Sequence, residues 1–354
     1  MSKLNIDKPE LSNTDANAYA AIDLGTNNCR LLIAQLTPNG FDVVDGLSKT
    51  VRLGEGVAAT NQLNPNAMGR TLNAIRSCAQ KINNWNIKRI RCVATEACRQ
   101  AKNGEEFLSR VVHETGLSFE IVTPNLEAHL TLHGCIPLFV PEKPKILLFD
   151  IGGGSTEIVW AEMTNPFTPH ILGVLSFPMG VVTLAETYGV DLLESEKFNQ
   201  ICGGVAKILA PFDSQYQISE AIEAGHVQMV GTSGTVTTLG ALTLGLERYE
   251  RKRVDGLQMS FKTIHQQISE IVSMDMDARR GIPCIGLERA GLMVMGCALL
   301  KAICTKWPVG ELRVADRGIR EGLLVEMIEK DRQNTAPLEN LSSAIPMTPT
   351  YIRR

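Results

Sequence analysis

An apolar segment that ends in an aspartate and breaks at three glycines constrains the fold more than any other stretch. The apolar run 146–149 predicts a buried strand, Asp150 follows it, and residues 152–154 are all glycine. Consecutive glycines allow positive φ angles, so this loop could turn its N–H groups toward a phosphate. Taken alone, a triple glycine is equally compatible with a plain tight hairpin.

A second copy of the pattern lies in residues 19–33. Both copies run from an apolar strand through aspartate, an apolar residue and glycine into a small polar turn and a second apolar strand. The alignment pairs Asp23 with Asp150, Gly25 with Gly152 and Arg30 with Glu157. We therefore expect a duplicated domain whose two phosphate loops face each other across one cleft. Asp150 would supply a hard oxygen suited to Mg²⁺ at its rim.

Length and composition indicate an intracellular globular protein. The chain has 354 residues, enough for two domains, with 44% hydrophobic and 21% charged residues. The net charge of −3 argues against a nucleic-acid binder. Nine scattered cysteines without a Cys-x-x-Cys pair predict reduced thiols and a cytoplasmic location. No apolar run reaches membrane-span length, and residues 1–17 read as a disordered leader without a signal-peptide core.

The predicted elements suggest two α/β domains. Residues 18–136 read as a first domain in βββαβαβα order, including a strand pair over 43–53 and a helix capped by Asn64-Pro65. Residues 137–318 form the expected second domain, with helices over 261–277 and 287–304. The final helix, 319–330, is a candidate to pack back on the first domain, and 331–354 are expected to be a flexible tail.

Five motifs together resemble one family. They span residues 23–27, 94–99, 150–157, 231–235 and 316–322. In this order they resemble the exopolyphosphatase / guanosine pentaphosphate phosphohydrolase (Ppx/GppA) family, in its short two-domain form, over about residues 18–330. The resemblance implies an α/β fold of duplicated actin-like domains with an interdomain cleft. This is the acetate and sugar kinase (ASKHA, ribonuclease H-like) fold, and a homodimer is also implied.

The resemblance also implies roles for individual residues. Glu127 would be the base that activates water, and Glu157 would help place that water or the metal. Mg²⁺ would be held by Asp150, Glu157 and Asp23, with a monovalent cation as an additional possibility. The implied phosphate-binding residues are Gly25, Thr26, Asn27, Arg30, Arg99, Gly152, Gly153, Gly154, Ser155, Thr156, Gly231, Thr232 and Ser233.

Some of these residues have plainer interpretations. Glu127 alone would read as an exposed helix carboxylate, and Arg99 as a salt-bridged surface arginine instead of a bidentate phosphate ligand. Residues 231–235 could either complete the cleft wall or only turn a strand into a helix. The basic cluster Arg248, Arg251, Lys252 and Arg253 is either a track for a polyanion or a solvated helix end.

The chain departs from the family pattern at several positions. His129 and Thr183 stand where basic residues are common, Gly291 where an aspartate is common, and Glu96 where the family usually has serine. Because the loop cores are intact, these departures bear on substrate preference and on grip of distal phosphates.

The expected activity is Mg²⁺-dependent release of orthophosphate from the ends of inorganic polyphosphate. The alternative within the family is removal of the 5′ γ-phosphate from pppGpp, with ppGpp as product. An ATP-dependent small-molecule kinase of the same fold and a non-catalytic alarmone-binding regulator are further alternatives. No membrane or nucleic-acid partner is expected.

Overall fold

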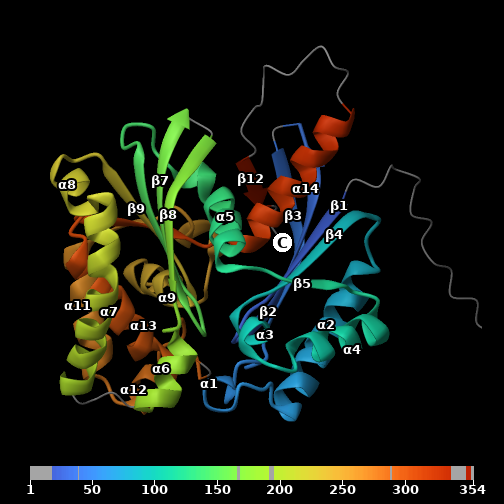
Figure 1. Ribbon diagram of the computed structural model, residues 1–354, viewed down its shortest axis with the longest axis horizontal. Helices are drawn as coiled ribbons and strands as arrows, with labels where there is room; N and C mark the ends of the chain where they lie inside the picture. Colours follow the sequence, from blue (N-terminus) through green and yellow to red (C-terminus); the bar gives the residue numbers. More distant parts are fainter. Residues whose placement is uncertain are drawn as a thin grey trace, which may run out of the picture.

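Two six-stranded sheets with flanking helices stand side by side in the computed structural model (Figure 1). The structure describes residues 18–38, 40–165, 168–190, 195–287, 289–335 and 348–351. Of the range 348–351 only the backbone is described. The expected leader, 1–17, and most of the expected tail lie outside these residues.

The first sheet has the strand order β12-β3-β2-β1-β4-β5. Its strands are β1 (Ala18–Leu24), β2 (Asn28–Thr37), β3 (Gly40–Thr50), β4 (Ile87–Ala94), β5 (Phe119–Ile121) and β12 (Thr348–Tyr351). The second sheet has the order β10-β11-β9-β6-β7-β8. Its strands are β6 (Lys145–Ile151), β7 (Thr156–Asn165), β8 (Thr168–Phe177), β9 (Val227–Thr232), β10 (Gln258–Ser260) and β11 (Glu311–Ala315).

The two sheets share one topology. In each, three antiparallel strands are followed by a strand that returns parallel to the first and by a further parallel strand beyond it. This is the ribonuclease H-like order, so the predicted class of duplicated actin-like domains is confirmed. The strand pair expected over 43–53 was wrong: one strand, β3, runs to Thr50 and pairs with β2 along its length.

Strand register confirms the internal alignment read from the sequence. Asp23 lies opposite Arg30 across the β1–β2 pair, and Asp150 lies opposite Glu157 across the β6–β7 pair. The two hairpins are therefore equivalent residue by residue, and each aspartate stands next to the end of its strand.

Helices α2 and α4 cover one face of the first sheet. The helices of this half are α1 (Val57–Thr60), α2 (Pro65–Ile82), α3 (Glu96–Gln100), α4 (Gly104–Thr115) and α5 (Pro124–Cys135), followed by a 3₁₀ turn over Ile136–Leu138. The Asn64 side chain accepts a hydrogen bond from the Asn66 amide, and Pro65 occupies the first turn, as expected. Apolar residues of α2 and α4, such as Ile75 and Val111, are buried in one cluster with Ile22.

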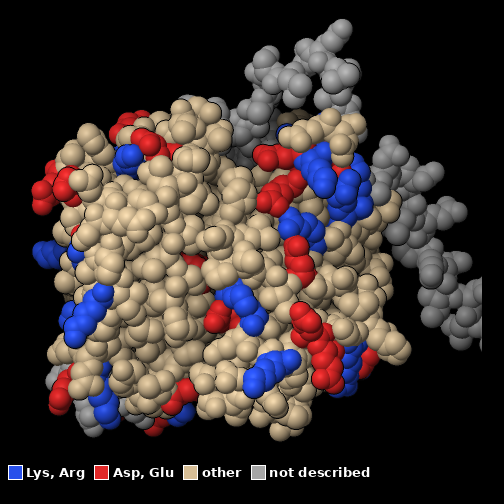
Figure 2. Space-filling view, in the orientation of Figure 1, with Lys and Arg blue, Asp and Glu red and all other residues tan. Residues whose placement is uncertain are grey.

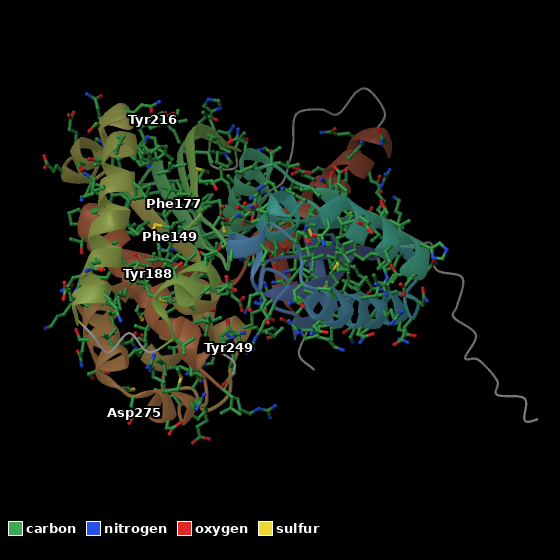
Figure 3. All side chains as sticks on the ribbon, turned by 60° about the horizontal axis from the view of Figure 1, so that its bottom comes forward. Phe149, Phe177, Tyr188, Tyr216, Tyr249 and Asp275 are labelled. Atoms are coloured by element: carbon green, nitrogen blue, oxygen red, sulfur yellow. The ribbon has the colours of Figure 1, made fainter. Side chains whose placement is uncertain are left out.

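The second half has a larger helical layer. Its helices are α6 (Val181–Tyr188), α7 (Ser195–Tyr216), α8 (Ile218–Glu223), α9 (Gly234–Thr243), α10 (Arg251–Val254), α11 (Phe261–Ser273), α12 (Met276–Arg280), α13 (Ala290–Lys306) and α14 (Ile319–Thr335). Phe149 and Phe177 of the sheet belong to the core under this layer (Figure 3). The helix expected over 261–277 breaks before Asp275, because that side chain accepts from the Ala278 amide and caps a new helix.

Helices α5 and α14 lie side by side between the two sheets (Figure 1). Ala128 and Leu132 of α5 are buried with Ile146 and Leu148 of the second sheet. Residues of α14, including Leu324, are buried against the first sheet instead. The expected first domain, 18–136, therefore ends in a helix that covers the second sheet, while the helix after residue 318 covers the first.

The tail expected from residue 331 begins as ordered structure. Helix α14 continues to Thr335, and Asp331 accepts hydrogen bonds from the Tyr19 hydroxyl at 2.8 Å and from Arg89 at 2.5 Å. Residues Thr348–Tyr351 then pair in parallel with β3. These contacts correct the boundary, because the end of α14 is held by polar partners on β1 and β4.

Acidic and basic side chains are interspersed on the face drawn in Figure 2, in keeping with the net charge of −3. Among the described residues, no helix has the length and apolar character needed to cross a membrane.

Candidate active site

The two hairpin turns are built alike. The Gly25 amide donates to the Asn28 carbonyl at 2.9 Å, and the Gly152 amide donates to the Ser155 carbonyl at 2.9 Å. Each turn therefore begins at the residue that follows the aspartate-bearing strand, and each is closed by the same hydrogen bond, from the amide of its first residue to the carbonyl three residues later. The duplication extends to the backbone of the loops.

Each turn is held from behind through its carbonyl groups. The Asn27 carbonyl accepts from the Val51 and Arg52 amides at 2.8 and 3.0 Å, and the Gly153 carbonyl accepts from the Val182 amide at 2.8 Å. The amides of Thr26, Asn27, Gly153 and Gly154 donate no hydrogen bond to any described residue. With the carbonyls engaged by neighbouring backbone, these amides are the donors that remain for an anion.

Close approach, not a positive φ, explains the three glycines. None of residues 152–154 has a positive φ, which corrects the sequence argument. A Cβ on Gly153 would lie 3.0 Å from the Thr26 Cβ, and one on Gly154 would lie 2.8 Å from the Thr26 hydroxyl oxygen. The first turn therefore sits directly against the second, as the duplicated pattern predicts.

The two turns line a cavity of about 140 Å³ between the sheets. Of the expected phosphate-binding residues, it brings together Gly25, Thr26, Asn27, Arg30, Gly152, Gly153, Gly154, Ser155 and Ser233. Asp23, Asp150 and Glu127 reach the same cavity. Thr95 and Glu96, which no sequence argument assigned to the wall, complete it from the loop after β4.

Glu127 lies in the first turn of α5. The Thr123 side chain caps this helix by accepting from the Leu126 amide, with Pro124 in the first turn. Glu127 is 7% exposed. Burial, together with the charge of Glu157, raises the pKa of Glu127, and the Arg99 cation opposes that rise. A buried carboxylate with a raised pKa is suited to accept a proton near neutral pH.

Arg99 lies behind Glu127 and does not line the cavity. Its Nη1 donates to Glu127 Oε2 at 3.2 Å and to the Val122 carbonyl at 2.6 Å, while Nε and Nη2 donate to Glu96 at 3.0 and 2.5 Å. These contacts use four of the five guanidinium N–H donors of Arg99, so in this structure its main contacts are with carboxylates.

Glu157 is also set back from the cavity. Its Oε1 accepts from the hydroxyls of Ser155 at 2.7 Å and Ser176 at 2.9 Å, and the side chain is 3% exposed. Thr156 is likewise turned away, because its hydroxyl donates to the Met179 carbonyl. Glu157 thus anchors the glycine loop through Ser155 and adds negative charge behind Asp150 and Glu127.

The third glycine-hydroxyl stretch is divided between a strand and a helix. Gly231 and Thr232 belong to β9, and the Thr232 hydroxyl donates to the Arg317 carbonyl. Ser233 caps α9 by accepting from the Val236 amide and lies on the cavity wall. Of the two interpretations of this stretch, the structure therefore shows both: a strand-to-helix turn and part of the wall.

A second cavity of about 450 Å³ adjoins the first and is rich in arginine. Asp23, Arg30, Asp150, Ser233, Gly234, Arg289 and Ile319 line both cavities. Within the described part of the chain, the guanidinium groups of Arg30, Arg289 and Arg320 form no hydrogen bond or ion pair with protein. Burial, with Arg30 and Arg251 nearby, lowers the pKa of Arg320.

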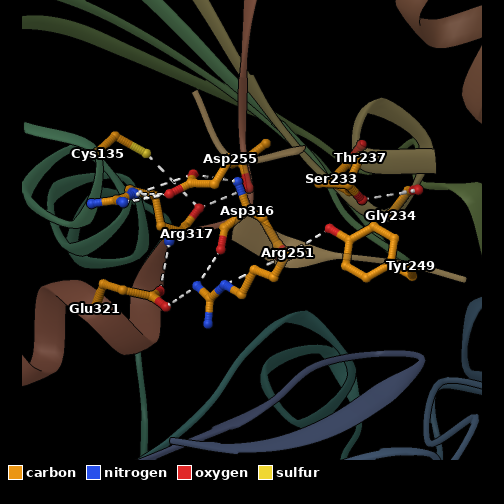
Figure 4. Close-up of polar contacts among 12 residues, drawn as sticks. Cys135, Ser233, Gly234, Thr237, Tyr249, Arg251, Asp255, Asp316, Arg317 and Glu321 are labelled. Carbon is orange, nitrogen blue, oxygen red and sulfur yellow. Dashed lines mark hydrogen bonds and ion pairs between the residues drawn. The ribbon is translucent and has the colours of Figure 1, made fainter. Parts of the chain in front are cut away.

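The predicted basic track divides in the structure (Figure 4). Arg251 lines the second cavity and pairs with Glu321 at 2.5 Å, next to an Arg317–Asp255 ion pair. Arg248, Lys252 and Arg253 do not line either cavity, and Arg253 pairs with Glu250. Burial raises the pKa of Glu321, but the cations Arg251 and Arg320 outweigh that effect and lower its pKa to about 2. Sequence analysis missed Arg289 and Arg320; only the motif at 316–322 hinted at the latter.

The carboxylates fit a magnesium ion. Asp23 Oδ1 is buried with no hydrogen-bond partner among the described residues. Burial, together with the charges of Glu157 and Asp23, raises the pKa of Asp150 to about 8. A dication between Asp23 and Asp150 would satisfy the orphaned oxygen and offset the repulsion, and both residues offer the oxygen ligands that Mg²⁺ prefers. Glu157, the third expected ligand, has one of its carboxylate oxygens, Oε1, bonded to two serine hydroxyls.

Two of the four departures from the family pattern touch the glycine turns: Glu96 lines the 140 Å³ cavity beside Gly154, and the Thr183 amide donates to the Gly153 carbonyl at 3.3 Å. Thr183 bonds the Gly180 backbone at the start of α6, and Gly291 lines a separate groove beside Val190. His129 points its Nε2 toward Glu326 Oε1, at 3.4 Å, on α14. Thr183, Gly291 and His129 do not line the 140 Å³ cavity.

Comparisons with known proteins agree on one family. The Ppx/GppA phosphatase family matches residues 32–331. The crystal structure of the Aquifex aeolicus family member is 27% identical, with a TM-score of 0.72, and the match covers 89% of this chain and 98% of that one. An exopolyphosphatase-like protein is 26% identical, with a TM-score of 0.78 and coverage of 89% and 98%. An exopolyphosphatase from Cytophaga hutchinsonii, 22% identical over 88% and 98% of the chains, shares the fold with a TM-score of 0.79.

Proposed function

This chain belongs to the Ppx/GppA phosphatase family, a family of hydrolases, and we propose that it releases orthophosphate from the ends of inorganic polyphosphate. The observation that carries the proposal is the continuity of the two cavities. A terminal phosphoryl group would occupy the 140 Å³ cavity beside Glu127, while the following phosphates would extend into the arginine-rich cavity. Arg30, Arg289 and Arg320 would neutralise a repeating polyanion there.

The reaction requires a water molecule in line with the terminal phosphorus atom. Glu127 accepts a proton from that water as its oxygen bonds to phosphorus, and the bridging P–O bond on the far side breaks. The products are orthophosphate and a polyphosphate shortened by one unit, whose new terminal oxygen takes the electron pair. The free amides of the two glycine turns would bind the equatorial oxygens of the transferred group.

Mg²⁺ is the proposed cofactor, held by Asp23 and Asp150. When bound, the ion would neutralise charge that builds up on the phosphoryl oxygens. Arg99 would keep the Glu127 carboxylate directed at the cavity, and Glu157 would fix Ser155 and its loop.

The same cavity could act on the 5′ γ-phosphate of pppGpp. Phosphate release measured with Mg²⁺ on equal concentrations of long-chain polyphosphate and pppGpp separates the two substrates. We expect faster turnover of polyphosphate; faster turnover of the nucleotide would reverse the assignment. ATP-dependent phosphorylation of a small molecule would indicate a kinase, and tight alarmone binding without any phosphate release would indicate a regulator.

Arginine variants sharpen this test. Arg320→Ala should raise KM for long polyphosphate more than for tripolyphosphate, because only the longer chain would reach the second cavity. Arg110→Ala, which removes an exposed arginine of α4, is the matched control and should change neither. Equal effects of Arg320→Ala on both chain lengths would argue against an extended chain in that cavity.

We further propose a cytoplasmic homodimer. The location is inferred from the scattered cysteines, which indicate reduced thiols, and the dimer is inferred from the family resemblance. The nine described cysteines form no disulfide, which is compatible with a reducing compartment. Light scattering of the purified protein tests the dimer, and a monomeric mass would exclude it.

A further inference from the structure

A cluster of two histidines and a glutamate joins α5 to α14 outside the cleft. His129, His133 and Glu326 each offer one ligand atom, and these atoms lie within 4.8 Å of one another. The two imidazole rings have their centroids 4.0 Å apart, and His129 Nε2 lies 3.4 Å from Glu326 Oε1. All three side chains are partly buried, so the group is neither a solvated surface cluster nor a sealed core.

Helix geometry explains why the histidines meet. Residues four apart lie on one face of a helix, so His129 and His133 project together from α5. At about 100° per residue they lie roughly 200° and 240° around the helix from Glu127, on its opposite side. The cluster therefore does not share the cavity of the proposed reaction, and neither histidine lines it.

We propose that His129, His133 and Glu326 form a binding site for a transition-metal dication, with Zn²⁺ the best match. Two imidazoles and one carboxylate are a ligand set that Zn²⁺ accepts, leaving a fourth position for water. The hard ion Mg²⁺ prefers oxygen ligands, so the two kinds of ion would separate between this site and the cleft.

The surroundings support ligation through one carboxylate oxygen. Arg91 donates to Glu326 Oε2 at 2.5 Å and also to Glu120, so Oε2 is held while Oε1 faces the histidines. Such an outer hydrogen bond orients a metal-binding carboxylate. The His129 side chain is 41% exposed, so an ion can reach the site from solvent.

A bound ion would connect α5, which follows the first sheet in the sequence but packs on the second, to α14, which follows the second sheet but packs on the first. Because α5 carries Glu127 and α14 covers the first sheet, the metal would tie the base-bearing helix to the opposite half. The primary expected effect is therefore on stability and not on substrate binding.

The test uses the full chain, freed of metal by chelation and returned to excess Mg²⁺ so that oxygen sites are occupied. Titration with Zn²⁺ by calorimetry and with Co²⁺ by visible absorption should show one site whose cobalt bands indicate nitrogen ligation. His133→Ala and Glu326→Gln should each weaken binding by more than about tenfold. His226→Ala, an exposed histidine outside the cluster, should bind like wild type.

Two further measurements make the result decisive. Zn²⁺ should raise the melting temperature of wild type but not of His133→Ala, whose cooperative melting without metal confirms folding. Asp150→Asn should keep Zn²⁺ binding, because that residue lies in the cleft. Equal affinity in wild type and His133→Ala, absence of binding in wild type, or loss of binding in Asp150→Asn would each overturn the proposal.

Discussion

Gly322 of α14 lies against the backbone carbonyl of Leu130 of α5, so closely that a Cβ on Gly322 would overlap that oxygen. Gly134 makes the reciprocal approach, since its Cβ would overlap the Gly318 carbonyl. Two glycines thus set the distance at which the helices cross. Because α5 carries Glu127 and α14 follows the loop with Arg317, this crossing positions the cleft.

The first prediction concerns that crossing. Gly322→Ala should lower the free energy of unfolding by about 1–3 kcal/mol, because the backbone carbonyl cannot move away from the added methyl group. Gly69→Ala is the matched control: this glycine lies in α2 with open space around its Cβ position, and the substitution should stabilise by about 0.4–1 kcal/mol. Urea denaturation measures both, and a neutral Gly322→Ala would contradict the close crossing.

The second prediction concerns the proposed base. Glu127→Gln keeps the size of the side chain but cannot accept a proton, so kcat should fall by about 10²–10⁴-fold with little change in KM. Steady-state phosphate release gives both constants. Glu105→Gln, on the exposed side of α4, should be unaffected. A Glu127→Gln enzyme within twofold of wild type would remove Glu127 from the chemistry.

The third prediction separates positioning from phosphate binding at Arg99. Arg99→Met should lower kcat by about 10–100-fold, since Glu127 loses the group that orients it. Burial already raises the pKa of Glu127 and the Arg99 cation opposes this, so its removal should shift the acidic limb of the kcat profile to higher pH. Arg99→Lys should restore part of that pH shift. A rise in KM with no movement of the limb would instead indicate a phosphate ligand.

The fourth prediction follows from Asp150. Burial, with Glu157 and Asp23 nearby, raises its pKa from 3.8 to about 8, so the folded state holds a proton that the unfolded state has released across this range. Stability contributed by the group therefore falls as pH rises through that window. Wild type should therefore lose stability between pH 5 and pH 8, whereas Asp150→Asn, which has no carboxyl group to titrate, should not. The stability of Asp150→Asn relative to wild type should be higher at pH 8 than at pH 5 by about 1 kcal/mol or more, and the variant should lose activity.

Urea denaturation of wild type and Asp150→Asn at pH 5 and pH 8, without Mg²⁺, measures this difference. Asp45→Asn, which removes the hydrogen-bond acceptor of Lys81 and Trp85, is a control of opposite sign and should destabilise. Added Mg²⁺ should stabilise wild type more than Asp150→Asn at pH 8. A pH-independent difference between the two proteins would show that the Asp150 carboxyl is ionised in the fold.

Local features were predictable because their causes lie within a few residues. The Asn64-Pro65 cap and the two aspartate-glycine turns depend on neighbouring side chains and on backbone hydrogen bonds of short span. The break at Asp275 was also local, but a run of helix-forming residues concealed the cap. The role of three glycines was misread, because close approach of Thr26 cannot be seen from φ preferences.

Contacts across the chain were not predictable from one sequence. The arginines of the second cavity that have no partner among the described residues come from β2, from the residue before α13 and from α14, at positions 30, 289 and 320. Each alone resembles a surface arginine. The resemblance implies that Arg99 binds phosphate, but nothing in its neighbourhood along the chain indicates that Glu127, 28 residues away, takes one of its donors.

The amino-acid sequence by itself determined the duplicated strand-turn-strand units, the class of fold and the family, since apolar strands, turn residues and the five motifs are local features of the chain. Only the tertiary structure decided which carboxylates reach the cavity, which arginines remain without partners, and that α5 and α14 exchange places between the sheets. Those outcomes depend on how apolar faces are buried against each other across hundreds of residues, and the burial of each charge follows from that packing.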